Sequence, residues 1–263
     1  MNKKIAAVVA LVLAITVSWQ LHQKQNRDAA NAGTKSDSAV TGDINVFAAS
    51  SLTETFTMLG KEYEASHPGV KVNFTFGSSS TLAQQIVAGA PVDVFASASK
   101  KSMDSAGDRM ITKADFVMNH VVVAYKAKDQ SSIPAGTTAA QLLNGSSVWI
   151  QCAHEAPCGA AADKAITAEG VTTQPKSLEP DVKSVLAKLL AGEVDFAIVY
   201  HTDVVAHSEL SEVEFVDKTA AVTDYSIGQV QGSNPATSDF LTYLKSPHAL
   251  ELYSKAGFGI PGQ

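Results

Sequence analysis

The sequence has only two cysteines, few charged residues and no excess of positive charge. Charged residues make up 17% of its 263 residues, and the formal net charge is -6. This charge argues against nucleic acid as a partner, because nucleic-acid-binding proteins present basic surfaces. It does not exclude a small anion, which backbone amides can bind even in an acidic protein. Because 45% of the residues are hydrophobic, the chain can bury one large core or two smaller ones, and we expect a globular α/β protein.

The sequence also lacks the pattern of a serine hydrolase. Such an enzyme needs a nucleophile, a base and an orienting group, and it often places the serine in a G-x-S-x-G turn. That turn is absent, and the seven histidines are scattered along the chain. We therefore predict a protein that is not an enzyme and has no cofactor, with a serine hydrolase as the remote alternative.

The most prominent apolar run of the chain lies at the N-terminus. Lys3 and Lys4 precede an apolar segment at 5–19, which is typical of an export signal. The run is a little shorter than the roughly 20 residues of a membrane-spanning helix. No small-residue cleavage pattern follows at the usual distance, so both a cleaved signal and a retained membrane anchor stay open. Residues 20–42 are polar and predict a linker, and the folded part is expected outside the cytoplasm, in the periplasm or on the extracellular face of the membrane.

The two cysteines, Cys152 and Cys158, are close in the sequence. In an exported chain, two nearby cysteines predict a disulfide. Their spacing differs from the CxxC of catalytic thiol pairs, and only His154 lies close enough to suggest zinc. We therefore expect a structural disulfide.

Apolar residues predict strands that alternate with helices from residue 44 onward. Strands are expected at 44–49, 70–76 and 92–96, with helices between them. This order indicates right-handed crossovers and a parallel sheet. Further strands are expected at 120–125, 148–152, 196–200 and 225–230, and further helices around 142–143 and at 159–169, 182–190, 239–244 and 247–255. Because the pattern restarts after residue 125, two small α/β lobes would fit the folded part, with the chain crossing between them.

Serines follow the first two predicted strands. Ser51 comes after the first strand, and Ser79 lies within a run of three serines after the second. Ligands of open α/β sheets bind at the carboxyl ends of strands, where helix N-termini offer free amides and a partial positive charge. These loops contain no lysine or arginine, so an anion there would be bound by neutral dipoles. The alternative is that the serines only cap helices, because the segments 51–54 and 81–84 both fit the capping-box pattern.

Three further positions are candidates for the same site. Cys158 directly precedes an alanine-rich helix, and Val182 begins another helix after Asp181, a favourable N-cap residue. Tyr200 ends a predicted strand, where a tyrosine is either a ligand donor or a packed core residue.

Several segments together resemble the periplasmic molybdate-binding proteins of ABC transporters, the ModA family. The longest are VFAASSLT from residue 46, GSSSTLAQQI from residue 77 and AGAPVDVFASA from residue 88. Shorter ones are PCG at 157–159, EPDV at 179–182 and AIVYHTD at 197–203. The similarity extends from about residue 43 to 258, nearly the whole folded part.

The resemblance implies a two-lobed type II periplasmic-binding-protein fold with the ligand cleft between the lobes. Lobe 1 would comprise 43–122 and 227–263, and lobe 2 would comprise 123–226. The implied ligand is molybdate or tungstate, so molybdenum enters only as the oxyanion. By motif, its contacts fall on Ser51, Ser79, Cys158, Val182 and Tyr200. The implied partners are an ABC permease and its ATPase, and a monomer is expected.

The resemblance has one departure and leaves competitors open. The best-known members have alanine where this chain has Cys158, a feature similar to the actinobacterial branch of the family. Sulfate or phosphate is the alternative ligand, although a phosphate carrier needs an acceptor such as Asp181 pointing inward. Iron carriers of this fold use paired tyrosines, whereas Tyr200 is followed by His201.

Overall fold

The computed structural model describes residues 41–262. The predicted export signal at 1–19 and nearly all of the predicted linker at 20–42 lie outside the described residues. The first strand, β1 (Gly42–Ala49), begins at the last residue of that linker. Within the described residues, no helix is both long and apolar enough to cross a membrane.

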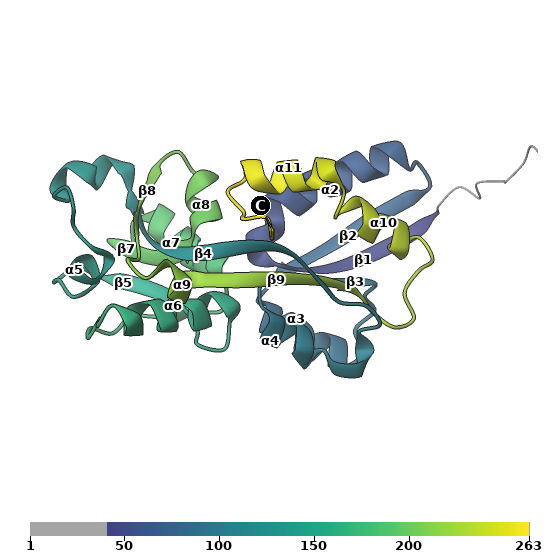
Figure 1. Cartoon of the computed structure of the whole chain (residues 1–263), viewed down its shortest axis with the longest axis horizontal. Helices are drawn as coiled ribbons and strands as arrows, with labels where there is room; N and C mark the ends of the chain where they lie inside the picture. The colour runs from purple at the N-terminus through teal and green to yellow at the C-terminus, as the bar shows by residue number, and fades with distance from the viewer. Residues whose placement is uncertain (1–40, 263) are drawn as a thin grey trace, which may run out of the picture. The chain divides into compact units, whose positions relative to one another are not determined.

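The first elements form a parallel sheet flanked by helices (Figure 1). Its strands are β1, β2 (Val70–Gly77) and β3 (Val94–Ser97), with β1 in the middle. The helical elements are η1 (Ser50–Leu52), α2 (Thr53–Ser66), α3 (Ser79–Val87), α4 (Lys100–Ser105) and η2 (Gly107–Arg109). The helical spacing of Phe56, Leu59 and Tyr63 gives α2 one apolar face, and all three residues are buried.

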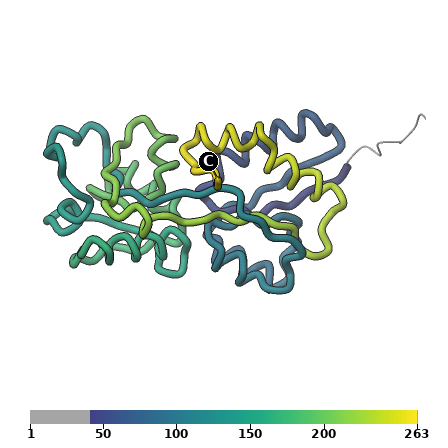
Figure 2. The backbone as a smooth tube through the Cα atoms, viewed as in Figure 1, coloured from purple at the N-terminus to yellow at the C-terminus, as the bar shows by residue number. Residues whose placement is uncertain are grey.

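Two long strands connect this sheet to a second group of strands. β9 (Val222–Gln229) pairs antiparallel with β3 and with the first part of β4 (Ala114–Lys126). The second part of β4 pairs antiparallel with β7 (Phe196–Tyr200) and β8 (Leu210–Glu214). Figure 2 shows β4 and β9 running side by side between the two groups. The complete order is β2-β1-β3-β9-β4-β7-β5-β6, with β8 beside β4.

The second group repeats the parallel α/β arrangement. β5 (Trp149–Cys152) lies between β7 and β6 (Leu178–Glu179), parallel to both. The helical elements are η3 (Ala127–Ser132), α5 (Ala139–Leu143), α6 (Pro157–Ala168), α7 (Val182–Ala191), α8 (His201–Val205) and α9 (Lys218–Ala221). The chain then returns to the first group.

The last two helices pack beside α2. They are α10 (Thr237–Tyr243) and α11 (Pro247–Lys255). The Tyr63 hydroxyl donates to Asp239 at 2.7 Å, and the ring centroids of Phe56 and Tyr253 lie 6.3 Å apart. The C-terminal segment therefore completes the part of the protein that the N-terminal strands begin.

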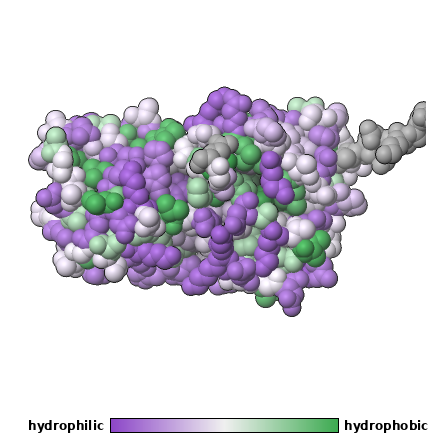
Figure 3. All heavy atoms as spheres, viewed as in Figure 1, coloured by the Kyte–Doolittle hydropathy of each residue, from purple (hydrophilic) through white to green (hydrophobic). Residues whose placement is uncertain are grey.

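The apolar side chains gather in separate clusters on the two sides of the crossing strands. One cluster consists of buried residues between Val121 and Ala221. Another combines residues such as Phe47, Leu82 and Phe95 with Val230 from the far end of the chain. Figure 3 shows a mostly hydrophilic face with scattered hydrophobic residues, which is ordinary for a globular surface. The predicted α/β architecture is confirmed, and the sheet is mixed because β4 and β9 run antiparallel to their neighbours.

Candidate functional site

All five predicted ligand residues line one small cavity. They are Ser51, Ser79, Cys158, Val182 and Tyr200. The first two follow strands β1 and β2, and the other three belong to elements beyond the crossing strands. The rest of the lining consists of Ala49, Ser50, Gly77, Ser78, Ala98, Pro157 and Asp181. The structure thus brings together residues that are up to 149 positions apart, counted from Ser51 to Tyr200.

The two serines are buried, and neither caps a helix. α2 begins at Thr53 without a side-chain cap, because Ser51 lies in the tight turn η1 that precedes it. α3 already begins at Ser79, so Thr81 lies inside the helix. The capping-box alternative is therefore wrong for both segments. The side chain of Ser79 instead accepts from the Ala98 amide at 2.9 Å, which leaves its own proton free to donate.

Ser51 is held by a chain of hydrogen bonds. The His120 amide donates to Asn119 Oδ1, so Asn119 Nδ2 is the donor, and it lies 3.4 Å from the Tyr225 hydroxyl oxygen. That oxygen is 2.7 Å from Ser51 Oγ. Because Tyr225 accepts from Asn119, its single proton can go to Ser51. Ser51 can then donate its own proton into the cavity.

Cys158 lies in the first turn of α6, tied to the end of β5. The predicted disulfide between Cys152 and Cys158 is confirmed, with Cα atoms 5.8 Å apart. A side chain at Gly159 would place its Cβ 2.0 Å from the Ala153 carbonyl oxygen, so glycine is needed for this close approach. The first amides of α6 have no carbonyl partner within the helix, and Cys158 is one of the residues that line the cavity.

Val182 is the first residue of α7, and the predicted cap of this helix is confirmed. The Ser184 amide donates to Asp181 Oδ1 at 3.0 Å. Since Asp181 satisfies Ser184, the Val182 amide remains available to a ligand. Asp181 itself is part of the cavity wall, with one carboxylate oxygen occupied by this cap.

Tyr200 ends β7, and its hydroxyl is buried without a hydrogen-bond partner among the described residues. The side chain is 1% exposed and belongs to the core cluster. Burial raises the pKa of Tyr200 well above its ordinary value, and the neighbouring Tyr225 hydroxyl acts in the same direction, although no hydrogen bond of normal geometry joins the two hydroxyls. The hydroxyl therefore stays protonated. A buried polar group without a partner is costly, so this hydroxyl is a candidate donor to a ligand.

The positive potential of the cavity comes from helix ends, because no lysine or arginine is among its lining residues, and Asp181 is the one acidic residue among them. The N-termini of α3, α6 and α7 each contribute a first-turn residue to its wall, and such ends carry partial positive charge. The nearby Lys183 is engaged elsewhere, with Nζ 2.9 Å from Asp203 and 2.8 Å from Glu54. Burial opposes the charge of Lys183, but these two carboxylates outweigh it and raise its pKa. Burial also raises the pKa of Asp203, against the effect of Lys183.

The arrangement can bind an anion but does not assemble a nucleophile and its base. The lining supplies hydroxyl and amide donors, and no histidine lies among the residues that line it. Sequence reasoning missed Asn119 and Tyr225, which orient Ser51. No local signal could have revealed them, because Tyr225 is 174 residues from Ser51 in the sequence.

Comparison with known proteins places this geometry in a family. A family model described as "Bacterial extracellular solute-binding protein" matches residues 44–259. The molybdate-binding protein ModA of Escherichia coli is 38% identical over 232 residues, covering 83% of this chain and 90% of that protein. ModA of Mycobacterium bovis is 33% identical over 224 residues, covering 83% and 85%. Because the identity to the Escherichia coli protein is higher than the identity to the Mycobacterium bovis protein, these two relatives do not place the chain in the actinobacterial branch of the family.

A solved structure agrees in fold. The periplasmic molybdate-binding protein of Azotobacter vinelandii superposes with a TM-score of 0.70 at 18% identity, covering 83% of this chain and 99% of that one. The cavity lies between the two α/β groups, because its lining combines residues from both of them. The chain therefore belongs to the bacterial extracellular solute-binding proteins, in the group represented by the molybdate-binding protein ModA.

Proposed function

We propose that this protein binds molybdate or tungstate in the cavity and delivers it to an ABC importer. The observation that carries the proposal is the buried hydroxyl of Tyr200, a residue of the cavity lining, which has no hydrogen-bond partner within residues 41–262. Ser51, Ser79 and the amides of Cys158 and Val182 complete a shell of neutral donors. This chain covers most of the length of two relatives that are named molybdate-binding proteins, which supports this ligand class.

The donor shell favours an oxyanion that is fully deprotonated. Every oxygen of molybdate, tungstate or sulfate is an acceptor near neutral pH, and each can meet a donor. Phosphate keeps a proton, which would face another donor and remain unpaired at a cost of about 1 to 3 kcal/mol. Asp181 is the group that could accept this proton, but its Oδ1 already caps α7. Sulfate has shorter bonds and would leave gaps in a rigid shell, so it is the weaker alternative.

We further propose that the chain forms two lobes which close on the anion. Lobe 1 comprises 43–122 and 227–263, and lobe 2 comprises 123–226, with β4 and β9 as the connections. The separate apolar clusters on the two sides of these strands support this division. Two ligand residues then come from lobe 1 and three from lobe 2. Because an anion held from both sides completes its donor shell on closure, it favours the closed form.

We further propose that the protein is exported and monomeric and that it has neither catalytic activity nor a cofactor. Its membrane partners would be a permease and its ATPase, as expected for the substrate-binding protein of an ABC transporter. The segment at 1–19 would direct export, either as a cleaved signal or as a retained anchor. The folded part would lie in the periplasm or on the extracellular face of the membrane.

Isothermal titration with molybdate, tungstate, sulfate and phosphate tests the ligand. Phosphate should bind about 5- to 150-fold more weakly than molybdate, since an unpaired group costs about 1 to 3 kcal/mol. Ser51→Ala and Ser79→Ala should weaken molybdate and tungstate alike, because both anions use the same donors. Ser246→Ala is the matched control: Ser246 caps α11 through the Ala249 amide, so this change should lower stability by about 1 kcal/mol and leave affinity unchanged.

Two outcomes would contradict the proposal. Equal affinity for phosphate and molybdate would mean that an acceptor, such as Asp181, points into the cavity. Unchanged affinity in both serine variants would mean that the anion binds elsewhere. Turnover of generic esters that disappears in Ser51→Ala would favour the hydrolase alternative.

A further inference from the structure

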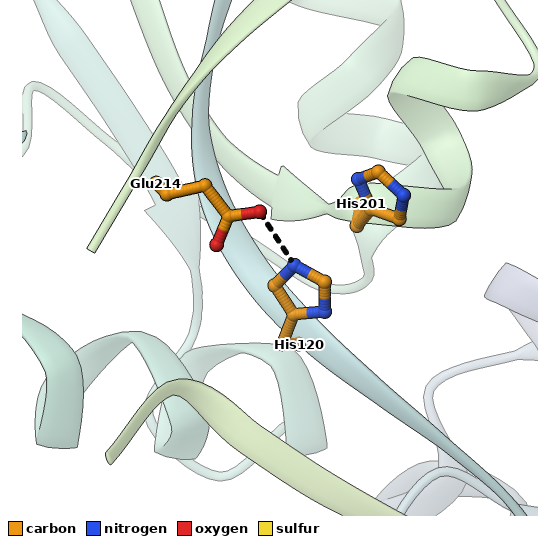
Figure 4. Close-up of side chains that lie close together, drawn as sticks. All are labelled: His120, His201 and Glu214. Atoms are coloured by element: carbon orange, nitrogen blue, oxygen red, sulfur yellow. Dashed lines mark hydrogen bonds and ion pairs between the residues drawn. The ribbon is translucent and has the colours of Figure 1, made fainter. Parts of the chain in front are cut away.

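Two histidines and a glutamate meet outside the anion cavity (Figure 4). His120 lies on β4, His201 is the first residue of α8, and Glu214 ends β8. His120 Nε2 is 3.2 Å from Glu214 Oε1, and one potential ligand atom from each residue lies within 4.8 Å of the others. The two imidazole rings stack with centroids 4.9 Å apart. All three side chains are partly buried.

The strand register creates this cluster. Val122 of β4 pairs with Glu214, and Ala124 pairs with Glu212. Alternate residues of a strand share a face, so His120 lies on the same face of the sheet as both glutamates. On the other side of β4, Val121 pairs with Tyr200, which puts the next residue, His201, beside His120. Three separate segments thus direct nitrogen and oxygen ligands to one place.

Glu212 supplies a second carboxylate beside the cluster. Its Oε1 is 2.8 Å from His201 Nδ1, and its Oε2 is buried without a hydrogen-bond partner among the described residues. Histidines that ligate metals are usually held by a carboxylate of this kind. The local charge also favours a cation, because two carboxylates face a single lysine, Lys218, which lies 3.6 Å from Glu214 and is largely exposed.

We propose that His120, His201 and Glu214 form a binding site for a divalent transition-metal ion, with Zn²⁺ the best match. Imidazole and carboxylate are ligands that zinc prefers, and three protein ligands leave one tetrahedral position for water. Neighbouring ligands of tetrahedral zinc lie about 3.4 Å apart, given bonds of about 2.1 Å, and the His120–Glu214 pair already has this spacing. A ligand nitrogen of His201 lies within 4.8 Å of the other two ligand atoms and would have to move closer to them to complete the set.

Two other histidines of the chain each form a simple ion pair with one carboxylate. His154 pairs with Asp163 and His248 pairs with Glu62, each at 2.7 Å and each with a single carboxylate. Both of these histidines are more than half exposed, at 62% and 54%, whereas His120 and His201 are 26% and 28% exposed. They provide matched controls because, in the part of the chain that the structure describes, neither has a second imidazole beside it.

Zinc titration of the full chain, prepared without a histidine tag and stripped with chelator, tests the site. Glu212 raises the pKa of His201, so a proton competes with the metal and the assay belongs at about pH 8. We expect one zinc ion per chain, with affinity reduced more than about tenfold in His120→Gln, His201→Gln and Glu214→Gln. His154→Gln and His248→Gln should bind zinc like the unchanged protein. Glu214→Gln nearly preserves the side-chain shape, and circular dichroism checks that each variant is folded.

Cobalt(II) provides a second, spectroscopic measurement. It should give visible absorption bands of a nitrogen- and oxygen-ligated ion in the unchanged protein and lose them in His120→Gln. The proposal is overturned if the unchanged protein binds no zinc. It is also overturned if the three cluster variants bind zinc as well as it does, or if the two control variants lose binding to the same extent.

Discussion

Replacing Tyr200 by phenylalanine removes one hydroxyl and keeps the ring. Since that hydroxyl is buried without a partner, the structure predicts effects of opposite sign on stability and on anion binding. Without anion, the change deletes an unpaired polar group, which costs about 1 to 3 kcal/mol when buried. The free energy of unfolding should therefore stay the same or rise.

With anion bound, the same change removes a hydrogen bond to a charged group. Such bonds contribute about 1.5 to 3 kcal/mol, which corresponds to a loss of about 10- to 150-fold in Kd for molybdate. Chemical denaturation without anion measures the first effect, and isothermal titration measures the second. Burial keeps the pKa of Tyr200 above its ordinary value, so the loss should be constant across neutral pH.

Tyr253→Phe is the matched control for this experiment. The Tyr253 hydroxyl is also buried, but it donates to the Leu244 carbonyl at 3.1 Å and does not line the cavity. This variant should lose about 1 kcal/mol of stability and keep its affinity for molybdate. If Tyr200→Phe instead behaves like this control, Tyr200 is a core residue and the reasoning about its hydroxyl is refuted.

Three other perturbations have expected outcomes. Reducing the disulfide between Cys152 and Cys158 should lower the free energy of unfolding by about 2 kcal/mol and weaken molybdate binding. Labelling that finds two free thiols in the unreduced, unfolded protein would contradict the disulfide. Lys183→Met should destabilise the protein by about 3 kcal/mol in chemical denaturation, because it leaves the buried carboxylate of Asp203 unpaired. Glu54→Gln removes only the half-exposed partner of Lys183 and should cost about 1 kcal/mol or less. Equal effects of the two changes would refute the buried ion pair. Asp181→Asn keeps an oxygen for the helix cap, so molybdate titration should show little change. A large gain in affinity for molybdate and phosphate alike would show instead that the carboxylate repels anions in the cavity.

Local patterns in the sequence were enough to predict most of the regular elements. The apolar alternation at 70–76 and the helical spacing of Phe56, Leu59 and Tyr63 predict β2 and α2, because these residues form the buried faces. The cap of α7 by Asp181 and the disulfide were also predictable, since both join residues close in the sequence. Short, polar elements such as β8 gave no such signal, because few of their side chains are buried.

The members of the candidate site were named from family motifs, and only the tertiary structure decided their geometry. The motifs could not show that Ser51 meets Tyr225 or that the Tyr200 hydroxyl lacks a partner. The capping-box pattern failed at Ser51 because a tight turn after β1 moves the helix start to Thr53.

The cluster of His120, His201 and Glu214 depends on the register of β4 with β7 and β8. A shift of one residue would turn these side chains to opposite faces of the sheet. Local sequence determined which segments become helices and strands, because that choice depends on which side chains each segment can bury. The pairing of distant strands decided which hydroxyls, amides and imidazoles meet, because that choice depends on contacts between residues far apart in the chain.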